Sequence, residues 1–250
     1  MNEVGGLPAH LVEADVDVIL LDELVLANRI LYRQAVVDAF GHVSQRHPRQ
    51  PGRFLMSRSL APARVTRADI TLLDERGEPI EGQPGIAYLE RFIHSAIYAL
   101  RPDVNAIVHS HSPSIVPFSA VQGAGLKPIF HMCGFLGGGA PVFEIRDTAG
   151  PASDLLVRNG DLGHALACCL GGASVVLMRG HGSTTVGASI RQAVYRAVYA
   201  EVNARLQMAA LQLGTPQYLT PEEAGAASRS NDRQIDRTWE LWRDDVIKSG

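Results

Sequence analysis

Segments with helical periodicity alternate with short apolar runs along this chain, and this alternation constrains its fold more than any other feature. Two of the runs, "AIV" within "NAIVHS" and "SVVLM", have the length and composition of buried strands. Strands that alternate with helices are typical of an α/β domain. At 250 residues and 46% apolar content the chain can bury a large core, so we expect one α/β domain over residues 1–250.

The same periodicity places the main elements. Apolar positions at helical spacing predict a helix from Val16 to about Asp38, continuous or broken, and another through "AYLERFIHSAIYAL" that Arg101-Pro102 ends. Strand pairs around Pro/Gly turns are predicted in "GHVSQRHPRQPGRFLMS" and "DITLLDERGEPI". The clearest helix runs from Ile190 to Leu213, where Ser189 can cap its start and Gly214 can close its end. The charged tail from 221 to 250 is expected to be partly helical, packed on the surface or on a neighbouring subunit.

Charge and cysteine content narrow the functional classes. A net charge of -3 argues against electrostatic capture of nucleic acid or of an acidic membrane surface. The acidic lead "MNEVGGLPAHLVEADVDV" lacks the basic start of a signal peptide, and no apolar run approaches the roughly 18 residues of a membrane span. Three cysteines, two of them adjacent in a predicted helix, suit a reduced cytoplasmic protein with buried thiols and no disulfide framework.

Two histidines lie two residues apart at the end of the run "NAIVHSHS". In a strand, residues i and i+2 point to the same face, so His109 and His111 can converge on one metal ion. They also follow a buried strand, where α/β sheets expose their functional loops. The alternative is a pair of hydrogen-bonded structural histidines, and the pair alone does not separate the two interpretations.

A third histidine favours the metal. His181 follows the strand "SVVLM" and stands between Gly180 and Gly182, which allow a tight turn that brings an imidazole inward. Three neutral nitrogen ligands leave coordination positions open, as a Lewis-acid catalyst requires. The competing interpretation is a glycine turn that carries a solvated histidine.

At this point the sequence resembles the class II aldolase/adducin family. The resemblance rests on "YLERFIHSAIYALRPDVNAIVHSHS", "LMRGHGSTTVG" and "GHVSQR", and it spans roughly residues 21 to 213. It implies a three-layer α/β/α fold with a central, mostly antiparallel, mixed sheet. It also implies that His109, His111 and His181 are metal ligands and that Glu90 is the catalytic acid/base.

The departures from the family pattern bear on the substrate. Members that cleave sugar phosphates carry "GNVS" and two small hydroxyl residues before the acid, which help to cradle the phosphate. Here the first motif is "GHVS", which ends in Ser44, and Tyr88-Leu89 precedes the acid. This predicts a flatter, partly apolar substrate with anionic groups, for which His42, Arg46 and Arg58 are candidate partners and Ser44 a further binding residue. Arginines at such positions can equally be ordinary surface residues.

Together with "IFHMCGFLG" and "PVFEIRD", this variant resembles the decarboxylase branch of the family. Its members remove a carboxylate from rings such as hydroxypyridine dicarboxylate or dihydroxyphthalate. The resemblance predicts a metal-dependent, non-oxidative decarboxylase, with His42 and His131 beside Glu90 in the pocket, although a histidine like His131 can also be a core residue. Mn²⁺ is the expected metal and Zn²⁺ the second choice, while Fe²⁺ and Co²⁺ also suit three imidazoles.

Alternative functions remain open at this stage. One is an aldolase or epimerase that acts on a sugar or hydroxy acid without phosphate, another is an adducin-like scaffold, and a third is an iron oxygenase. The family also implies a homotetramer whose sites are completed by tyrosines of the neighbouring subunit. Tyr195, Tyr199 and Tyr218 are candidates, but Tyr195 and Tyr199 lie one helical turn apart, as core or interface residues would.

Overall fold

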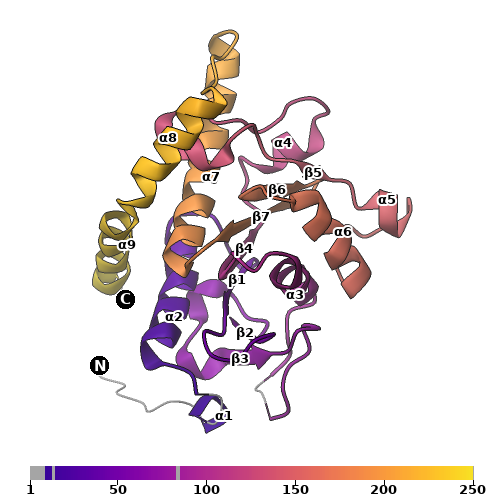
Figure 1. The fold of residues 1–250 in the computed structure, drawn as a ribbon, viewed down its shortest axis with the longest axis vertical. Coiled ribbons are helices and arrows are strands. Elements are labelled where there is room, and N and C mark those ends of the chain that lie inside the picture. Colours follow the sequence, from indigo (N-terminus) through magenta and orange to yellow (C-terminus); the bar gives the residue numbers. More distant parts are fainter. Residues whose placement is uncertain (1–8, 13–14, 83–84, 250) are drawn as a thin grey trace.

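The structure is a computed structural model that describes residues 9–12, 15–82 and 85–249 of the chain. A seven-stranded sheet crosses it in the order β3-β2-β1-β4-β7-β6-β5 (Figure 1). Neighbouring strands are antiparallel except β5 and β6, which are parallel, so the expected mixed, mostly antiparallel sheet is confirmed. The strands are β1 (His42–Arg46), β2 (Phe54–Ser57), β3 (Ile70–Leu73), β4 (Ala106–Ser110), β5 (Val142–Phe143), β6 (Val175–Met178) and β7 (Gly182–Gly187).

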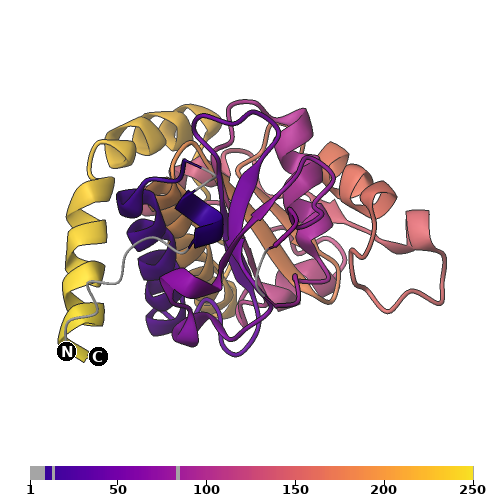
Figure 2. The ribbon, with the colours of Figure 1, turned by 90° about the horizontal axis from the view of Figure 1, so that it is seen from below.

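Helices cover both faces of the sheet, which confirms the three-layer arrangement (Figure 2). The helices α2 and α7 share a core with Val108 of β4, whereas α3 and α6 share a core with Ile107. Adjacent residues of one strand thus enter opposite cores, as the alternation of side chains along a strand requires. The α-helices are α1 (Ala9–Val12), α2 (Val18–Arg33), α3 (Arg91–Leu100), α4 (Val116–Ala120), α5 (Arg146–Ala149), α6 (Gly160–Leu170), α7 (Ile190–Leu213), α8 (Pro221–Asp232) and α9 (Ile235–Ser249). The 3-10 helices are η1 (Pro62–Arg64), η2 (Arg67–Asp69) and η3 (His131–Leu136).

Two helices are shorter than predicted. The helix α2 begins after Asp17, whose carboxylate accepts a hydrogen bond from the backbone of Ile19. It ends at Arg33 because the chain turns at Ala35, where a φ of 56° leaves the helical region, so the extension to Asp38 was wrong. The helix α3 begins only after the acid of "AYLERFIHSAIYAL", which places that acid at a helix start rather than inside the helix.

Other predictions were closer to the structure. The helix α7 spans the predicted residues, and the Ser189 hydroxyl accepts a hydrogen bond from the backbone of Gln192. The segment "DITLLDERGEPI" forms one strand and a single bridge between Leu73 and Pro79, because the turn leaves too few residues for a second strand. Cys133 is buried and Cys169 is half-buried against the core, but Cys168 is exposed on α6, so the prediction of buried thiols was wrong for Cys168.

The C-terminal tail is helical and packs on its own chain. The side chains of Trp239 and Trp242 on α9 are buried in the same core as α2 and α7. The helix α8 lies against η3 so closely that a Cβ atom on Gly134 would stand 2.3 Å from the carbonyl oxygen of Ala224. Among the helices that the structure describes, none is long and apolar enough to cross a membrane.

Candidate metal centre and adjoining pocket

Two antiparallel strands bring the three predicted ligands together. His109 belongs to β4, His111 follows the end of that strand, and His181 directly precedes β7, which pairs with β4. The approach of the two chains depends on Gly182, because a Cβ atom there would stand 2.1 Å from the carbonyl oxygen of Ser110. Gly180 adopts a φ of +63°, so both glycines beside His181 are needed for the turn that the sequence predicted.

The ring nitrogens converge on one point together with a carboxylate. The Nε2 atom of His111 lies 3.3 Å from that of His109 and 2.9 Å from that of His181. The Oε2 atom of Glu90 lies 3.4 Å from Nε2 of both His109 and His181. All four ligand atoms fall within 4.8 Å of one another, and we call these four residues the metal cluster.

The donor atoms of the metal cluster suit a divalent cation. The Nδ1 atom of His181 donates a hydrogen bond to the carbonyl oxygen of Leu155 over 2.8 Å, which leaves a lone pair on its Nε2 atom. Two nitrogens at about 2.1 Å from a tetrahedral metal lie roughly 3.4 Å apart, close to the separations within the cluster. Three imidazole nitrogens and a carboxylate oxygen that converge on one point are a donor set that divalent cations prefer, so the residues fit a bound metal.

Glu90 is held at the edge of this cluster by its second oxygen. Its Oε1 atom accepts a hydrogen bond from the backbone N–H of Val157 over 2.9 Å, so the side chain turns toward the pocket instead of capping α3. Burial alone would raise the pKa of Glu90, but the charge and the hydrogen bonds of His109 and His181 outweigh it and hold the pKa well below its usual range. Glu90 is therefore a carboxylate in the resting site.

A pocket of about 370 Å³ opens onto the metal cluster. Glu90, His109 and His111 form its polar floor, and His42 and Ser59 add polar groups to its wall. The rest of the lining is mainly apolar and includes Ala39, Phe40, Leu60, Ala61, Tyr88, Leu89 and Leu156. A pocket of this kind suits a small molecule with one apolar face and a few anionic groups.

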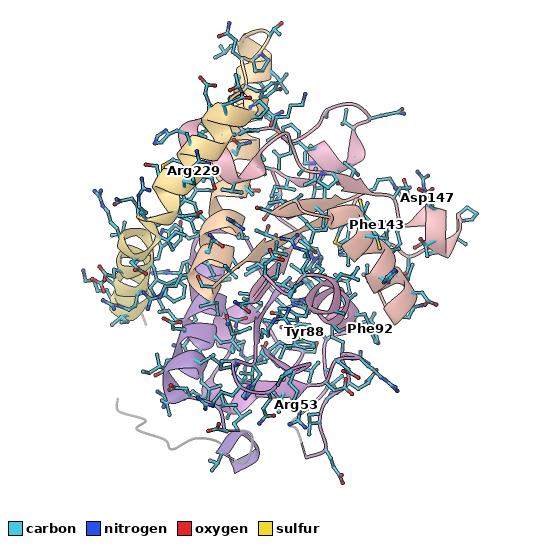
Figure 3. All side chains as sticks on the ribbon, in the orientation of Figure 1. Arg53, Tyr88, Phe92, Phe143, Asp147 and Arg229 are labelled. Atoms are coloured by element: carbon cyan, nitrogen blue, oxygen red, sulfur yellow. The ribbon has the colours of Figure 1, made fainter. Side chains whose placement is uncertain are left out.

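Tyr88 and Leu89 take the place that small hydroxyl residues would occupy in a phosphate cradle. Both line the pocket, and the Tyr88 hydroxyl bonds to the backbone of Leu60, which ties the opposite wall in place. The Tyr88 ring lies 4.6 Å from that of His42, and Figure 3 shows Tyr88 beside α3 near the centre of the molecule. The prediction of a partly apolar substrate site agrees with this lining.

Behind His42, a row of four polar side chains runs into the protein. His42 Nδ1 lies 2.7 Å from Nε2 of His94, whose Nδ1 lies 2.6 Å from the Ser44 hydroxyl, which lies 2.7 Å from the Tyr98 hydroxyl. We call these residues the buried chain. His94 and Tyr98 were not identified from the sequence, although polar residues four apart that directly follow Ile93 and Ile97 on the apolar side of a helix could have signalled them.

The structure brings only some of the other predicted residues to the pocket. Ser44 stands behind His42, and the Arg46 guanidinium donates to three backbone carbonyl groups and lies over the Tyr98 ring. Arg58 pairs with Asp69 over 2.8 Å and lies next to the pocket residue Ser59. His131 is exposed on η3 and belongs neither to the core nor to the pocket of the described chain.

The tyrosines proposed for a subunit interface have partners within the chain. Tyr195 is buried and donates a hydrogen bond to the carbonyl oxygen of Met132. Its ring lies 4.6 Å from that of Tyr199, while the Tyr218 hydroxyl accepts from Gln207. Tyr195 therefore has a core position, one of the two that its spacing suggested.

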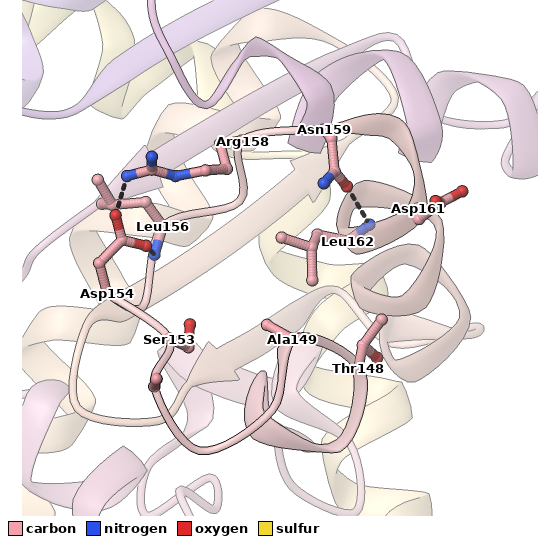
Figure 4. Close-up of a pocket in the computed structure, with 10 residues that line it drawn as sticks. Thr148, Ala149, Ser153, Asp154, Leu156, Arg158, Asn159, Asp161 and Leu162 are labelled. Carbon is pink, nitrogen blue, oxygen red and sulfur yellow. Dashed lines mark hydrogen bonds and ion pairs between the residues drawn. The ribbon is translucent and has the colours of Figure 1, made fainter.

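A second pocket, of about 490 Å³, lies between α5, α6 and the loop that joins them (Figure 4). Several of its polar groups have local partners, because Asp154 pairs with Arg158 and the Asn159 side chain accepts a hydrogen bond from the backbone N–H of Leu162. None of its described lining residues is a histidine or belongs to the metal cluster. The smaller pocket at the metal cluster is therefore the better candidate site.

Comparisons with known proteins identify the family of this chain. Residues 22–208 match the family model described as the class II aldolase and adducin N-terminal domain. The decarboxylase tropJ of Talaromyces stipitatus is 38% identical over 88% of this chain and 91% of that protein. A 3,4-dihydroxyphthalate decarboxylase of Arthrobacter keyseri is 32% identical over 77% of this chain and 79% of its own. The crystal structure of an aldolase II superfamily protein from Pseudomonas syringae superimposes with a TM-score of 0.76 at 26% identity, covering 96% of this chain and 98% of that one.

Proposed function

Because this chain belongs to the class II aldolase and adducin family, we propose that it is a metal-dependent, non-oxidative decarboxylase of a hydroxylated aromatic carboxylate. The observation that carries the proposal is the pocket at the metal cluster, where Tyr88 and Leu89 form an apolar wall beside Glu90. The relatives named as decarboxylases support the reaction class, and one of them is named for dihydroxyphthalate.

The metal cluster would hold the ion through His109, His111 and His181, with Glu90 beside it. A divalent ion bound there supplies a Lewis acid that stabilises negative charge on the hydroxyl and carboxylate oxygens of the substrate. We propose Mn²⁺ as the native ion and Zn²⁺ as the second choice. Three imidazoles also accept Fe²⁺ and Co²⁺. The apolar wall formed by Tyr88 and Leu89 would hold the ring of the substrate and exclude water from its face.

Glu90 is the proposed proton carrier. As a resting carboxylate it can accept the proton of the hydroxyl group next to the scissile carboxylate. It then returns that proton to the ring carbon, the bond from this carbon to the carboxylate breaks, and its electron pair passes to the ring as carbon dioxide leaves. The resulting phenolate takes one proton from solvent, so the overall reaction consumes one proton and yields one carbon dioxide.

His42 and Arg58 are the proposed partners of a further anionic group. His42 lines the pocket, and Arg58 lies beside the pocket residue Ser59, although its Nε atom is engaged by Asp69. The exposed position of His131 leaves it available to the site of a neighbouring subunit in the proposed homotetramer. Light scattering of the purified protein would measure the subunit number.

The test is carbon dioxide release by the purified protein before chelation, after chelation and after Mn²⁺ is restored. The substrate panel contains dihydroxyphthalates, hydroxypyridine dicarboxylates and dihydroxybenzoates, with a sugar phosphate and a hydroxy acid as controls. Release from one aromatic acid that chelation abolishes and Mn²⁺ restores is the expected result. Aldehyde release from a control, with no release from any aromatic acid, would instead make the protein an aldolase.

A further inference from the structure

The buried chain has a property that its distances alone determine. Each of its three contacts is 2.6 to 2.7 Å long, and each must contain one proton, because two lone pairs or two hydrogens cannot meet at that separation. The protons can therefore all point toward the pocket, or His42 can donate to His94 and His94 to Ser44, with the Tyr98 hydroxyl either donating to Ser44 or accepting from it. In the first case His94 donates to Nδ1 of His42, and in the second His42 donates to His94.

The two ends of the buried chain decide between these directions. At the inner end the Tyr98 hydroxyl has no other acceptor than Ser44 among the described residues. If His42 donated to His94, the hydroxyl hydrogen of either Tyr98 or Ser44 would be buried without an acceptor among the described residues, which is unfavourable. If all point outward, Tyr98 donates to Ser44, Ser44 donates to His94, and every buried hydrogen has an acceptor.

The number of protons on His94 also supports the outward direction. Burial first, and then the charge of His109, lowers the pKa of His94 to about 3, so His94 is neutral and has a single N–H. With Ser44 donating to its Nδ1 atom, that N–H is at Nε2 and points to His42. Nδ1 of His42 then accepts, and its own hydrogen is on Nε2, the nitrogen that makes no hydrogen bond within the described residues.

We infer that His94, Ser44 and Tyr98 are positioning residues that hold His42 as the tautomer with its hydrogen on Nε2, so that it donates a hydrogen bond to an anionic oxygen of the substrate. This inference rests on the proposed function for the identity of the substrate. It makes His42 a binding residue for a carboxylate and excludes it as a fourth imidazole ligand, although its ring centroid lies only 4.9 Å from that of His109. It also gives the predicted substrate-binding residue Ser44 an indirect role.

Nuclear magnetic resonance can detect the tautomer without any turnover. In protein labelled with ¹⁵N-histidine and loaded with diamagnetic Zn²⁺, long-range proton–nitrogen spectra distinguish hydrogen on Nε2 from hydrogen on Nδ1. The His42 signals are assigned by their loss in a His42→Gln variant. We expect His42 with hydrogen on Nε2 in the unaltered protein, and a hydrogen on Nδ1 would overturn the inference even if no variant folds.

A matched pair of variants tests the role of the chain. Ser44→Ala removes the donor to His94, so we expect both tautomers of His42 and a KM for the acid substrate raised about two- to tenfold, the loss of one hydrogen bond, with a smaller change in kcat. Thr71 pairs with Met56, which in turn pairs with Ser44, so Thr71→Val removes a buried hydroxyl two strands away from Ser44. This variant should change neither the His42 tautomer nor the KM.

The outcomes separate this inference from the proposed function. The positioning role would be overturned if His42 kept a single, unchanged tautomer in Ser44→Ala. It would also be overturned if Thr71→Val mixed the tautomers and raised the KM as much as Ser44→Ala does. The expected tautomers in a protein that decarboxylates no aromatic acid would leave the positioning role standing and refute only the reaction.

Discussion

Two groups of histidines lie side by side, one at the ends of β4 and β7 and the other between β1 and α3, and they differ in where the ring protons can go. In the metal cluster, Nε2 of His111 lies 3.3 Å and 2.9 Å from the Nε2 atoms of two other imidazoles, and a carboxylate oxygen joins them. In the buried chain, His42 and His94 meet at 2.7 Å through one nitrogen each. Three converging lone pairs need a cation, whereas two nitrogens in line need only a proton between them. Proximity of imidazoles therefore does not identify a metal site, but the direction of their nitrogens does.

Removing one imidazole from each group should have the largest effect and should affect the two groups differently. His181→Ala should abolish tight metal binding and turnover together, because the remaining ligands no longer surround the ion. His94→Gln should retain the metal at full stoichiometry, since its nitrogens point along the buried chain. Metal content after dialysis, measured by mass spectrometry, gives the result. A metal-free but active His181→Ala protein would contradict the assignment of the cluster.

The next test separates the carboxylate of the metal cluster from its imidazoles. Glu90→Gln should keep the metal bound and lower kcat by about 100-fold or more, because the amide cannot carry the proton to the ring carbon. Glu78→Gln is the matched control, since Glu78 is an exposed carboxylate that pairs with Arg91 at the start of the same helix. If Glu90→Gln lost the metal as fully as His181→Ala does, Glu90 would be a ligand and not the proton carrier.

The sequence predicted the metal cluster better than its surroundings, for a physical reason. His109 lies in β4, His111 directly after it and His181 directly before β7, so alternation along the strand and the flanking glycines bring them together. Glu90 came from the family resemblance, and its position before α3 depends on the hydrogen bond from Val157, which lies 67 residues away along the chain. No local pattern encodes a contact of that separation.

The buried chain shows the opposite case. Ser44 was predicted to bind substrate because it ends the motif "GHVS", yet the strand places it against α3, where His94 and Tyr98 meet it. Arg46 faces backbone carbonyl groups for the same reason. The side chains of His42, Ser44 and Arg46 share one face of β1, but of these three only His42, at the start of the strand, lines the pocket, because α3 covers the rest of that face. How much of a strand a helix covers depends on tertiary packing, which is not visible in one segment of sequence.

A smaller effect tests the support of the metal cluster. The Thr184 hydroxyl lies 3.4 Å from Nδ1 of His109, a long contact that helps to orient the ring. Thr184→Val should weaken metal affinity about tenfold, near the lower limit for residues that support a ligand. Thr185→Val alters the next residue, which faces the other side of the strand and should leave affinity unchanged. Competition with a fluorescent chelator measures both constants, and equal affinities for the two variants would show that Thr184 does not support His109.

The neutral state of His94 in the buried chain should also affect the stability of the fold. The pKa of His94 falls from 6.5 to about 3 on folding, because burial and then the charge of His109 disfavour its protonated form. Between these values the unfolded chain binds a proton that the folded protein does not. Above pH 6.5 His94 is neutral in both states and does not reduce the free energy of unfolding. As the pH falls from 6.5 toward 3, the free energy of unfolding decreases with a slope of up to about 1.4 kcal/mol per pH unit.

Urea unfolding of the metal-free protein between pH 6.5 and 4.5 measures that slope without any change in metal occupancy. His94→Gln should flatten the fall in the free energy of unfolding, because glutamine takes up no proton in either state. His164→Gln, at an exposed position on α6, should follow the unaltered protein. If the slopes of all three proteins coincide, His94 does not stay neutral in the folded protein. The inference that His94 has a single N–H, which points to His42, would then be wrong.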